Sequence, residues 1–299
     1  MRRRERVAGA APLVACARLV APLLPQPGIR DKREVVATVA VAQREAESHA
    51  DVRIPDAILT DVNTGRFDDW SAEQILTWGL DTFAPRIALS ASFGSPEGLV
   101  ILDMMHKLRP TATRVFTLDT GRMFQETYEL MDRVRNRYQI EVEVYFPRPE
   151  AVEAMVRQHG LNLFYDSVAL RQKCCGVRKV EPLQRAMRDL DAWIAGLRPT
   201  QSVTRTAVRK VEVDDVHGGR LKLNPLADWS KDDVWAYIDK HNVPVNALHA
   251  KGFPSVGCLP CTRAIEPGED ERAGRWWWEN AATRECGIHT GYEEQGSGI

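Results

Sequence analysis

Apolar and polar positions alternate in blocks along most of the chain, from about residue 54 onward. Short runs that are apolar, or that alternate with polar residues, predict strands at 86–91, 114–118 and 141–146. Longer mixed stretches predict helices at 96–108, 123–137 and 149–159. A further strand is expected at 192–195, and a hairpin or edge region at 208–224. This alternation predicts an α/β fold, in which a mostly parallel sheet carries helices on both faces.

Local end signals support several of these helices. Ser71 and Gln74 have the spacing of a capping box, and Ser230 precedes another helix. Pro96 follows Ser95, and proline in the first turn behind a serine cap is a good signal for a helix start. The helices therefore begin at positions that the sequence itself marks.

Composition narrows the functional classes. The chain has 299 residues, of which 44% are hydrophobic and 27% charged, as in an ordinary globular protein that can bury a core. Its net charge of -1 gives no general attraction to nucleic acid or to an anionic membrane. No stretch after the N-terminal region is apolar for long enough to span a membrane. Any anionic ligand must therefore be held by local basic residues.

The chain is expected to divide into three parts. Residues 1–50 begin with a basic run and continue with an apolar stretch that prolines and Arg18 interrupt, so we expect a dispensable or disordered extension rather than a targeting signal. Residues 51–265 are expected to form the α/β domain, and the polar, glycine-rich residues 266–299 a mobile tail. Clustered thiols beside a lone one suit a reducing compartment, so a cytoplasmic location is expected.

Two strand ends carry residues that suit a nucleotide. Ser90–Ser95 lies between a strand and a helix start, where hydroxyls, backbone amides and the helix dipole can hold a phosphate. Thr117–Arg122 offers a carboxylate, a hydroxyl and a guanidinium at the next strand end. The alternatives are an ordinary turn at the first segment and a helix cap at the second, but two such loops on one sheet favour the functional interpretation.

Four of the six cysteines form two close pairs, Cys174-Cys175 and Cys258-Leu-Pro-Cys261. Adjacent cysteines rarely form a disulfide with each other, whereas two distant pairs can supply four thiolates to one metal centre. We favour an iron–sulfur cluster over zinc because neighbouring cysteines can bind different irons of a cluster. Basic residues at 171–179 would offset its negative charge. Cys286 stands alone and is free for chemistry, and Cys16 is interpreted as a bystander.

Five segments together resemble the assimilatory sulfonucleotide reductases, and more narrowly the bacterial thioredoxin-dependent adenylyl-sulfate reductases. They are Leu-Asp-Thr-Gly-Arg at 118–122, Cys-Cys-Gly-Val-Arg-Lys-Val-Glu-Pro-Leu at 174–183, Gly-Cys-Leu-Pro-Cys-Thr-Arg at 257–263, Gly-Arg-Trp-Trp-Trp-Glu at 274–279 and Glu-Cys-Gly-Ile-His at 285–289. The resemblance covers about residues 55 to 291. It implies an adenine nucleotide α-hydrolase-like fold, a four-iron four-sulfur cluster, and reduction of adenosine 5′-phosphosulfate to sulfite and AMP.

The resemblance also implies roles for individual residues. The cluster ligands would be Cys174, Cys175, Cys258 and Cys261. Catalysis would fall to Cys286 as nucleophile, with Lys179 between cluster and substrate. His289 would bind substrate or tune Cys286, and the alternative is a plain polar residue of the tail. Substrate binding would involve Ser90, Ser92, Phe93, Gly94, Leu118, Asp119, Thr120, Gly121, Arg122, Arg272 and Arg275, and by a looser match Arg198 and Arg205. The segment Ser95–Gly98 departs from the commoner acidic version of the serine loop, which affects its individual contacts.

In the implied mechanism the Cys286 thiolate attacks sulfur, expels AMP and becomes an S-sulfonate, which thioredoxin or a glutaredoxin-like dithiol then resolves. The lone tail cysteine has no resolving partner nearby, and its glycine-rich flanks would let it move. Three alternatives stay open: the 3′-phosphorylated nucleotide as substrate, a tRNA sulfurtransferase, and a non-catalytic metal-containing nucleic-acid-binding protein. A homo-oligomer is also open.

Overall fold

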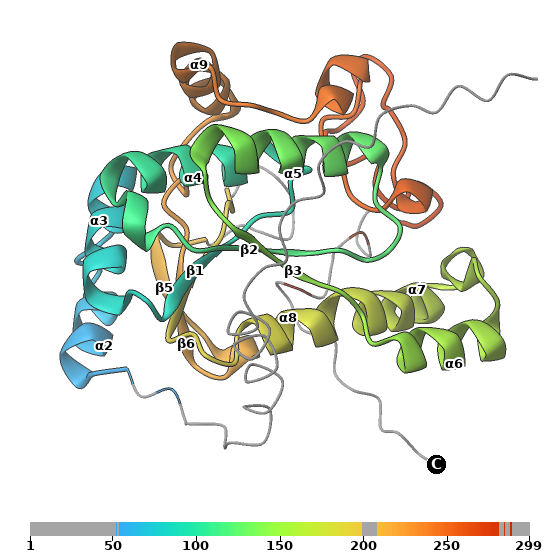
Figure 1. Ribbon diagram of the computed structural model, residues 1–299, viewed down its shortest axis with the longest axis horizontal. Helices are drawn as coiled ribbons and strands as arrows, with labels where there is room; N and C mark the ends of the chain where they lie inside the picture. Colours follow the sequence, from blue (N-terminus) through green and yellow to red (C-terminus); the bar gives the residue numbers. More distant parts are fainter. Residues whose placement is uncertain (1–51, 53, 199–207, 281–283, 285–287, 289–299) are drawn as a thin grey trace, which may run out of the picture. The chain divides into compact units, whose positions relative to one another are not determined.

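The computed structural model describes residues 52, 54–198, 208–280, 284 and 288, all within the compact unit Ala50–Ile299 (Figure 1). Its helices are α2 (Asp56–Asn63), α3 (Ala72–Phe83), α4 (Pro96–Leu108), α5 (Gln125–Tyr138), α6 (Pro149–His159), α7 (Val168–Cys175), α8 (Glu181–Ala186) and α9 (Lys231–His241). Its strands are β1 (Ile87–Ser90), β2 (Val115–Leu118), β3 (Val142–Tyr145), β4 (Ala192–Ile194), β5 (Val211–Asp214) and β6 (Arg220–Leu223). The helices expected at 96–108 and 149–159 have the predicted bounds.

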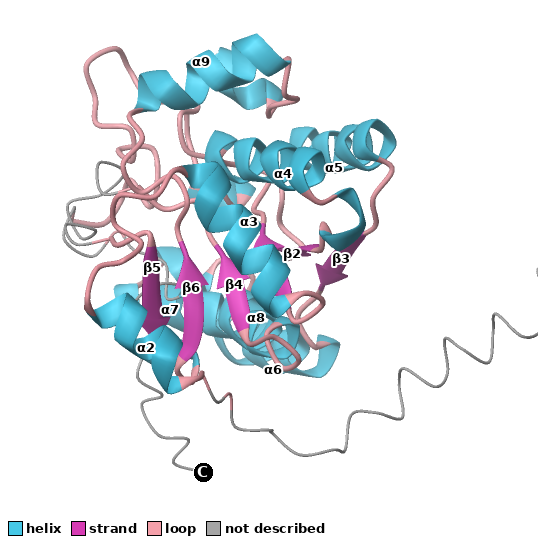
Figure 2. Cartoon of the chain, turned by 90° about the vertical axis from the view of Figure 1, so that its left-hand side faces the viewer, coloured by secondary structure: helices cyan, strands magenta, loops and turns pink. Residues whose placement is uncertain are grey.

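The strands form one sheet in the order β3-β2-β1-β4-β6-β5. All neighbouring pairs are parallel except β5 and β6, which are antiparallel and leave β5 at the edge. The predicted hairpin or edge region at 208–224 is therefore confirmed. Figure 2 shows the strands side by side, with helices above and below them. The prediction of a mostly parallel sheet with helices on both faces is confirmed.

Each central strand sends alternate side chains to opposite faces, as the pleat requires. On β1, Ile87 and Leu89 join the cluster that contains α3, α4, α5 and α9, whereas Ala88 joins the cluster around α8. On β4, Ile194 and Trp193 divide in the same way. Both faces of these strands are buried, which is why their sequences are almost continuously apolar rather than alternating.

The helix caps agree with the sequence at two of three sites. The Ser71 and Ser230 side chains each accept a backbone hydrogen bond, in capping boxes with Gln74 and Asp233. Ser95 occupies the cap position before Pro96, but its side chain makes no capping hydrogen bond. The expectation of a serine cap there is corrected, whereas the expected proline in the first turn of α4 is present.

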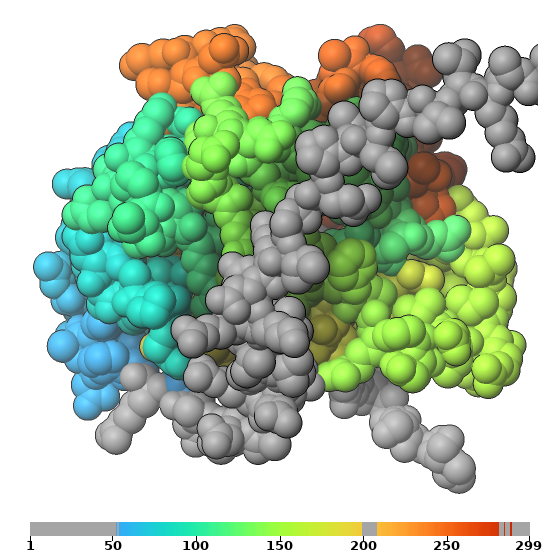
Figure 3. Space-filling model, viewed as in Figure 1, coloured from blue at the N-terminus to red at the C-terminus, as the bar shows by residue number. Residues whose placement is uncertain are grey.

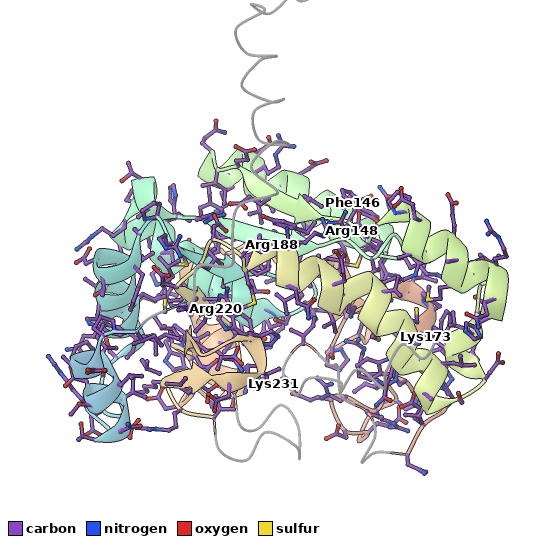
Figure 4. The ribbon with its side chains drawn as sticks, turned by 90° about the horizontal axis from the view of Figure 1, so that it is seen from below. Phe146, Arg148, Lys173, Arg188, Arg220 and Lys231 are labelled. Carbon is purple, nitrogen blue, oxygen red and sulfur yellow. The ribbon has the colours of Figure 1, made fainter. Side chains whose placement is uncertain are left out.

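Below the sheet, as Figure 1 shows it, a helical run from α7 to α8 was not predicted from the sequence. A π-helix at Gly176–Val180 joins the two helices. Lys173 on α7 lies 3.0 Å from His159 at the end of α6, and Arg148 before α6 donates to Glu181 of α8 (Figure 4). These contacts hold α6, α7 and α8 together.

The α9 helix and the residues after it cover the top of the view in Figure 3.

In the part of the chain that the structure describes, none of the helices has the length and apolar character that a membrane span requires. The expected N-terminal extension, residues 1–50, lies outside the described residues, as does nearly all of the expected tail beyond Asn280. The three-part division, the cytoplasmic location and the homo-oligomer therefore stay predictions.

Candidate active site

A cavity of about 210 Å³ opens at the carboxyl ends of β1 and β4. Ligands of open α/β sheets bind where the strand order reverses, and β1, which lies between β2 and β4, is that switch point here. We call this space the strand-end cavity. The predicted residues on its walls are Ser90, Ser92, Leu118, Thr120, Lys179, Arg198, Arg272 and Arg275.

The loop Ser90–Ser95, which we call the serine loop, packs against the segment that precedes Cys258 and Cys261. Phe93 is buried and has a left-handed backbone with φ of 54°, which is costly for a bulky residue and persists only where its surroundings hold it. The Asn246 side chain donates to the Phe93 carbonyl at 3.0 Å. A Cβ at Gly94 would lie 2.3 Å from the Val256 carbonyl oxygen, so only glycine fits. Phe93 and Gly94 therefore shape the loop, while its serines face the cavity.

The next loop, Leu118–Arg122, divides between two places. Leu118 and Thr120 line the strand-end cavity. The Asp119 carboxylate accepts from the Gly121 amide at 2.7 Å and from the Tyr128 hydroxyl at 3.0 Å, so it braces the turn. Arg122 donates to the Leu161 carbonyl at 2.6 Å and lies on a different, smaller cavity. The structure thus brings only part of this predicted group to the substrate side.

Positive charge lines the strand-end cavity from three separate segments. Arg198 follows β4 and forms a buried ion pair with Glu97 at 2.8 Å, which explains how a carboxylate is tolerated in this cavity. The Arg272 guanidinium donates to the Arg284 carbonyl at 3.2 Å. Arg275 is buried, and its Nε makes no hydrogen bond to any described residue. A buried guanidinium with an unused donor is suited to an anion. Arg205 lies outside the described residues.

The two cysteine pairs meet. Cys174, Cys175, Cys258 and Cys261 line one small cavity, which we call the cysteine cavity. Burial raises the pKa of the Cys261 thiol to about 12, and burial also raises the pKa of Cys174. Such thiols become thiolates when a metal replaces their protons. Among the described residues, no group of three or more His, Cys, Asp or Glu side chains is arranged to hold a single metal ion.

Basic and polar groups surround the cysteine cavity. Thr120 Oγ1 lies 3.3 Å from Cys258 Sγ. Arg178 donates from its Nη1 to the Thr120 carbonyl, while its buried Nε makes no hydrogen bond to any described residue. Lys179, Arg275 and Trp276 line both this cavity and the strand-end cavity. The two cavities therefore share a wall, and two cations stand in it.

Cys286 and His289 lie outside the described residues, so their roles stay predictions. Their described neighbours Arg284 and Ile288 are close to the strand-end cavity: Arg284 accepts from Arg272, and Ile288 is part of the cavity wall.

Several wall residues were not predicted. They include Glu97, Trp193, Gly196, Leu197 and Trp276. A usable signal existed for Gly196 and Leu197, because they follow a predicted parallel strand and so stand at its carboxyl end. Trp276 belongs to the motif at 274–279, but nothing in the sequence placed it on this wall, because its position depends on contacts between distant segments.

Fold and site together define a mostly parallel α/β protein with a cavity lined by basic residues at its strand ends and a cavity lined by four cysteines beside it. The model of the family described as phosphoadenosine phosphosulfate reductase domain matches residues 86–264. The chain belongs to this family, which confirms the family predicted from the motifs.

The similarity extends to named relatives. The chain is 50% identical over 204 residues to the adenosine 5′-phosphosulfate reductase of Burkholderia cepacia, covering 68% of this chain and 80% of that protein. It is 42% identical over 255 residues to the enzyme of the same name from Agrobacterium fabrum, covering 82% and 96%. Among solved structures, the phosphate complex of phosphoadenylyl-sulfate reductase from Candida auris matches with a TM-score of 0.59 and 30% identity, covering 71% of this chain and 98% of that one. The chain is therefore an enzyme, a sulfonucleotide reductase.

Proposed function

We propose that this protein reduces adenosine 5′-phosphosulfate to sulfite and AMP in assimilatory sulfate reduction. The observation that carries the proposal is a cavity at the strand ends lined by serines, Lys179 and three arginines. This cavity lies in a chain that is 50% identical over 204 residues and 51% identical over 203 residues to two proteins named for this reaction. The 3′-phosphorylated nucleotide is the second candidate, supported by the family description and by the Candida auris structure at 30% identity.

In the first step the Cys286 thiolate attacks the sulfur of the substrate. A sulfur–sulfur bond forms, the bond between sulfur and the phosphate oxygen breaks, and AMP leaves with that electron pair. Negative oxygens shield the sulfur, so attack requires that cations neutralise them. Lys179, Arg272 and Arg275 on the cavity wall are the groups for this task. The same positive charge favours the thiolate form of an approaching cysteine.

In the second step a dithiol partner of the thioredoxin class resolves the Cys286 S-sulfonate. One partner thiolate attacks the Cys286 sulfur, releasing sulfite and forming a mixed disulfide, and the second partner thiol then frees the Cys286 thiolate. The partner leaves as a disulfide, so its two thiols supply both electrons. Two contacts support the choice of Cys286 as the nucleophile. Arg284 and Ile288 flank Cys286 in sequence; the Arg284 carbonyl accepts from Arg272 on the cavity wall, and Ile288 is itself part of that wall.

We further propose that the four cysteines hold a four-iron four-sulfur cluster. The fit rests on four cysteine side chains around one cavity and on the basic residues Arg171, Arg178 and Lys179 beside them. A zinc ion needs its sulfurs at about 2.3 Å from one point, whereas a cluster spreads its ligands over several irons. When bound, the cluster would supply local charge and rigidity beside Lys179 and Arg275, which hold the substrate anion.

The test is an intact-mass measurement on anaerobically purified protein incubated with adenosine 5′-phosphosulfate and no reductant, then denatured. We expect a gain of one sulfonate group that thioredoxin removes. Cys286→Ser should show no gain, while Cys16→Ser, which changes a cysteine outside every motif, should behave as the wild type. The 3′-phosphorylated nucleotide is run in parallel, and the faster-labelling nucleotide identifies the substrate. Protein that retains iron but gains no adduct with either nucleotide contradicts the covalent mechanism.

A further inference from the structure

Trp276 connects the two cavities and has an unusual backbone. Its side chain is 1% exposed and lines both the strand-end and the cysteine cavity. Its φ of 43° lies in the left-handed region, where a bulky residue is strained unless its surroundings hold it. Three guanidinium groups face its ring: Arg275 at 4.7 Å, Arg171 at 4.9 Å and Arg272 at 5.9 Å from the ring centroid. Arg272 and Arg275 are the cations of the substrate side.

Arg171 approaches the same ring from the cysteine side. It lies on α7, one turn before Cys174 and Cys175, so it shares their side of the helix. Its side chain is 0% exposed and pairs with Glu279, which is 2% exposed, through two hydrogen bonds of 2.9 and 2.8 Å. The backbone amide of Glu279 in turn donates to the Trp276 carbonyl at 2.8 Å. The ion pair therefore joins the cysteine helix to the strained turn that carries the substrate arginines.

We propose that the Arg171–Glu279 ion pair is a positioning element for substrate binding. It holds the Trp276 ring, and the ring holds the guanidinium groups of Arg272 and Arg275 toward the phosphate end of the nucleotide. A residue moved by less than an ångström can change how well a bound anion is oriented. Because α7 carries two of the four cysteines, the pair also links the cysteine cavity to substrate affinity. That the ligand of this cavity is a nucleotide with a phosphate group rests on the proposed function.

A buried ion pair that serves only the fold would behave differently. Removing one partner would leave a buried charge and weaken the whole domain, whereas replacing both by apolar residues of similar size is often neutral for stability. General loosening would weaken every ligand alike. A positioning role affects only ligands that carry the anion which Arg272 and Arg275 hold, and that difference can be measured.

The experiment compares AMP with adenosine on iron-containing enzyme. The variants are Arg171→Met/Glu279→Met, which removes both charges together, and Glu279→Gln, which removes one. We expect the dissociation constant for AMP to rise about tenfold in each, and the KM for adenosine 5′-phosphosulfate to rise by a similar factor, typical of coupling between sites. The dissociation constant for adenosine, which lacks the phosphate, should stay unchanged. Arg171→Lys, which keeps the charge but not the paired geometry, should give an intermediate loss.

Two controls define the outcome. Glu269→Gln breaks the partly exposed Arg263–Glu269 ion pair, at 2.7 Å in the same segment, and should leave AMP affinity unchanged. In an Arg272→Met/Arg275→Met background, Glu279→Gln should add little, because both groups that it positions are already gone. Unchanged AMP affinity in the iron-containing double variant overturns the proposal, and so does an equal loss for AMP and adenosine. A wild-type enzyme that binds AMP but reduces no sulfonucleotide refutes the proposed function instead, and the comparison of AMP with adenosine still judges the ion pair.

Discussion

The strand-end cavity and the cysteine cavity share a wall, yet they are built in different ways. The first stands on the ends of β1, β2 and β4, which are strands with apolar neighbours on both faces of the sheet. The second is formed by α7, by the π-helix after it, and by a segment from 254 to 280 that holds only short helical turns. Its contacts join residues that are far apart in sequence, such as Cys174 and Cys261.

This difference concerns what holds each region together. Apolar packing, with the buried ion pair between Arg198 and Glu97 described above, fixes the strand ends, and apolar burial tolerates many local changes if volume is kept. Charged and polar groups fix the cysteine cavity: the buried Arg171–Glu279 pair, the Arg178 bond to the Thr120 carbonyl, and four thiols. Such groups lose much when one partner is removed. We therefore expect single substitutions to have larger functional effects on the cysteine side than at the strand ends.

The largest effect is expected from Cys258→Ser. Its sulfur lies 3.3 Å from the Thr120 hydroxyl and belongs to the thiol set that we propose as cluster ligands. Removing one thiolate should release the iron and lower sulfite formation by at least about a hundredfold. This loss is larger than that expected on removing a residue that only hydrogen-bonds to a metal ligand. Iron analysis and visible absorption report the first effect, and sulfite release the second.

The sheet should survive that substitution, because its core is separate from the cysteine cavity. Far-ultraviolet circular dichroism of Cys258→Ser should therefore resemble that of Cys16→Ser, the matched control. Full sulfite formation by a Cys258→Ser protein that lacks iron would contradict both the cluster assignment and the contrast between the two regions.

Much of the strand-end region could be predicted from the sequence for the same physical reason. Strand ends, capping boxes such as Ser71 with Gln74, and Pro96 at a helix start depend on neighbouring residues, so the local pattern contains the information. Ser90, Ser92 and Thr120 were found because they follow strands. Arg122 shows the limit: its residue type suits a phosphate, but its partner is the carbonyl of Leu161, which no local pattern indicates.

A second substitution tests how closely the shared wall is packed. A Cβ at Gly257 would lie 2.2 Å from the Nη2 atom of Arg275, so Gly257→Ala must displace that buried guanidinium. We expect kcat/KM to fall about tenfold or more, because Arg275 is proposed to bind the substrate and misplacing a group of that kind has effects of that size. The end of an arginine side chain can move, so stability should change little.

Gly176→Ala is the matched control for this test. Gly176 follows Cys175, has an ordinary right-handed backbone with φ of -54°, and has no atom within 4 Å of an added Cβ. We expect unchanged kinetics and a gain of about 0.5–1 kcal/mol in stability, since alanine restricts the unfolded chain more than glycine does. Equal kinetics for Gly257→Ala and Gly176→Ala would show that the Arg275 position is not important.

The sequence did not predict how the cysteine region is assembled. The motifs identified the four cysteines as one set, because an adjacent pair and a Cys-x-x-Cys pair are chemically unusual together. They did not indicate that Arg171 pairs with Glu279, 108 residues away, nor that Trp276 adopts a left-handed backbone. Both follow from the packing of separate segments, and pattern reasoning with one sequence has no access to that packing.

The smallest effect is expected behind the strand-end cavity, where Asp214 supports Trp193. Its buried carboxylate accepts from Trp193 Nε1 at 2.9 Å and lies 2.7 Å from His217 Nδ1. Burial alone would raise the pKa of Asp214, but the hydrogen bond and charge of His217, with the charge of Lys222, outweigh it and lower the pKa below its usual value. Folding is therefore stabilised above the unfolded pKa of about 3.9, and this contribution is lost as pH falls through the lower folded value.

Asp214→Asn should consequently lower the free energy of unfolding at pH 7 by about 1–3 kcal/mol, the loss expected when buried donors keep a poorer acceptor. The gap between variant and wild type should narrow once the pH falls below about 4, because the wild-type carboxyl then takes up a proton as well. Urea unfolding of both proteins at a series of pH values measures this gap, and any acid-labile centre is lost from both alike, so the difference isolates Asp214. A gap that widens toward low pH would mean that Asp214 is protonated in the folded enzyme at neutral pH, and the wall around Trp193 would then depend on a neutral hydrogen bond.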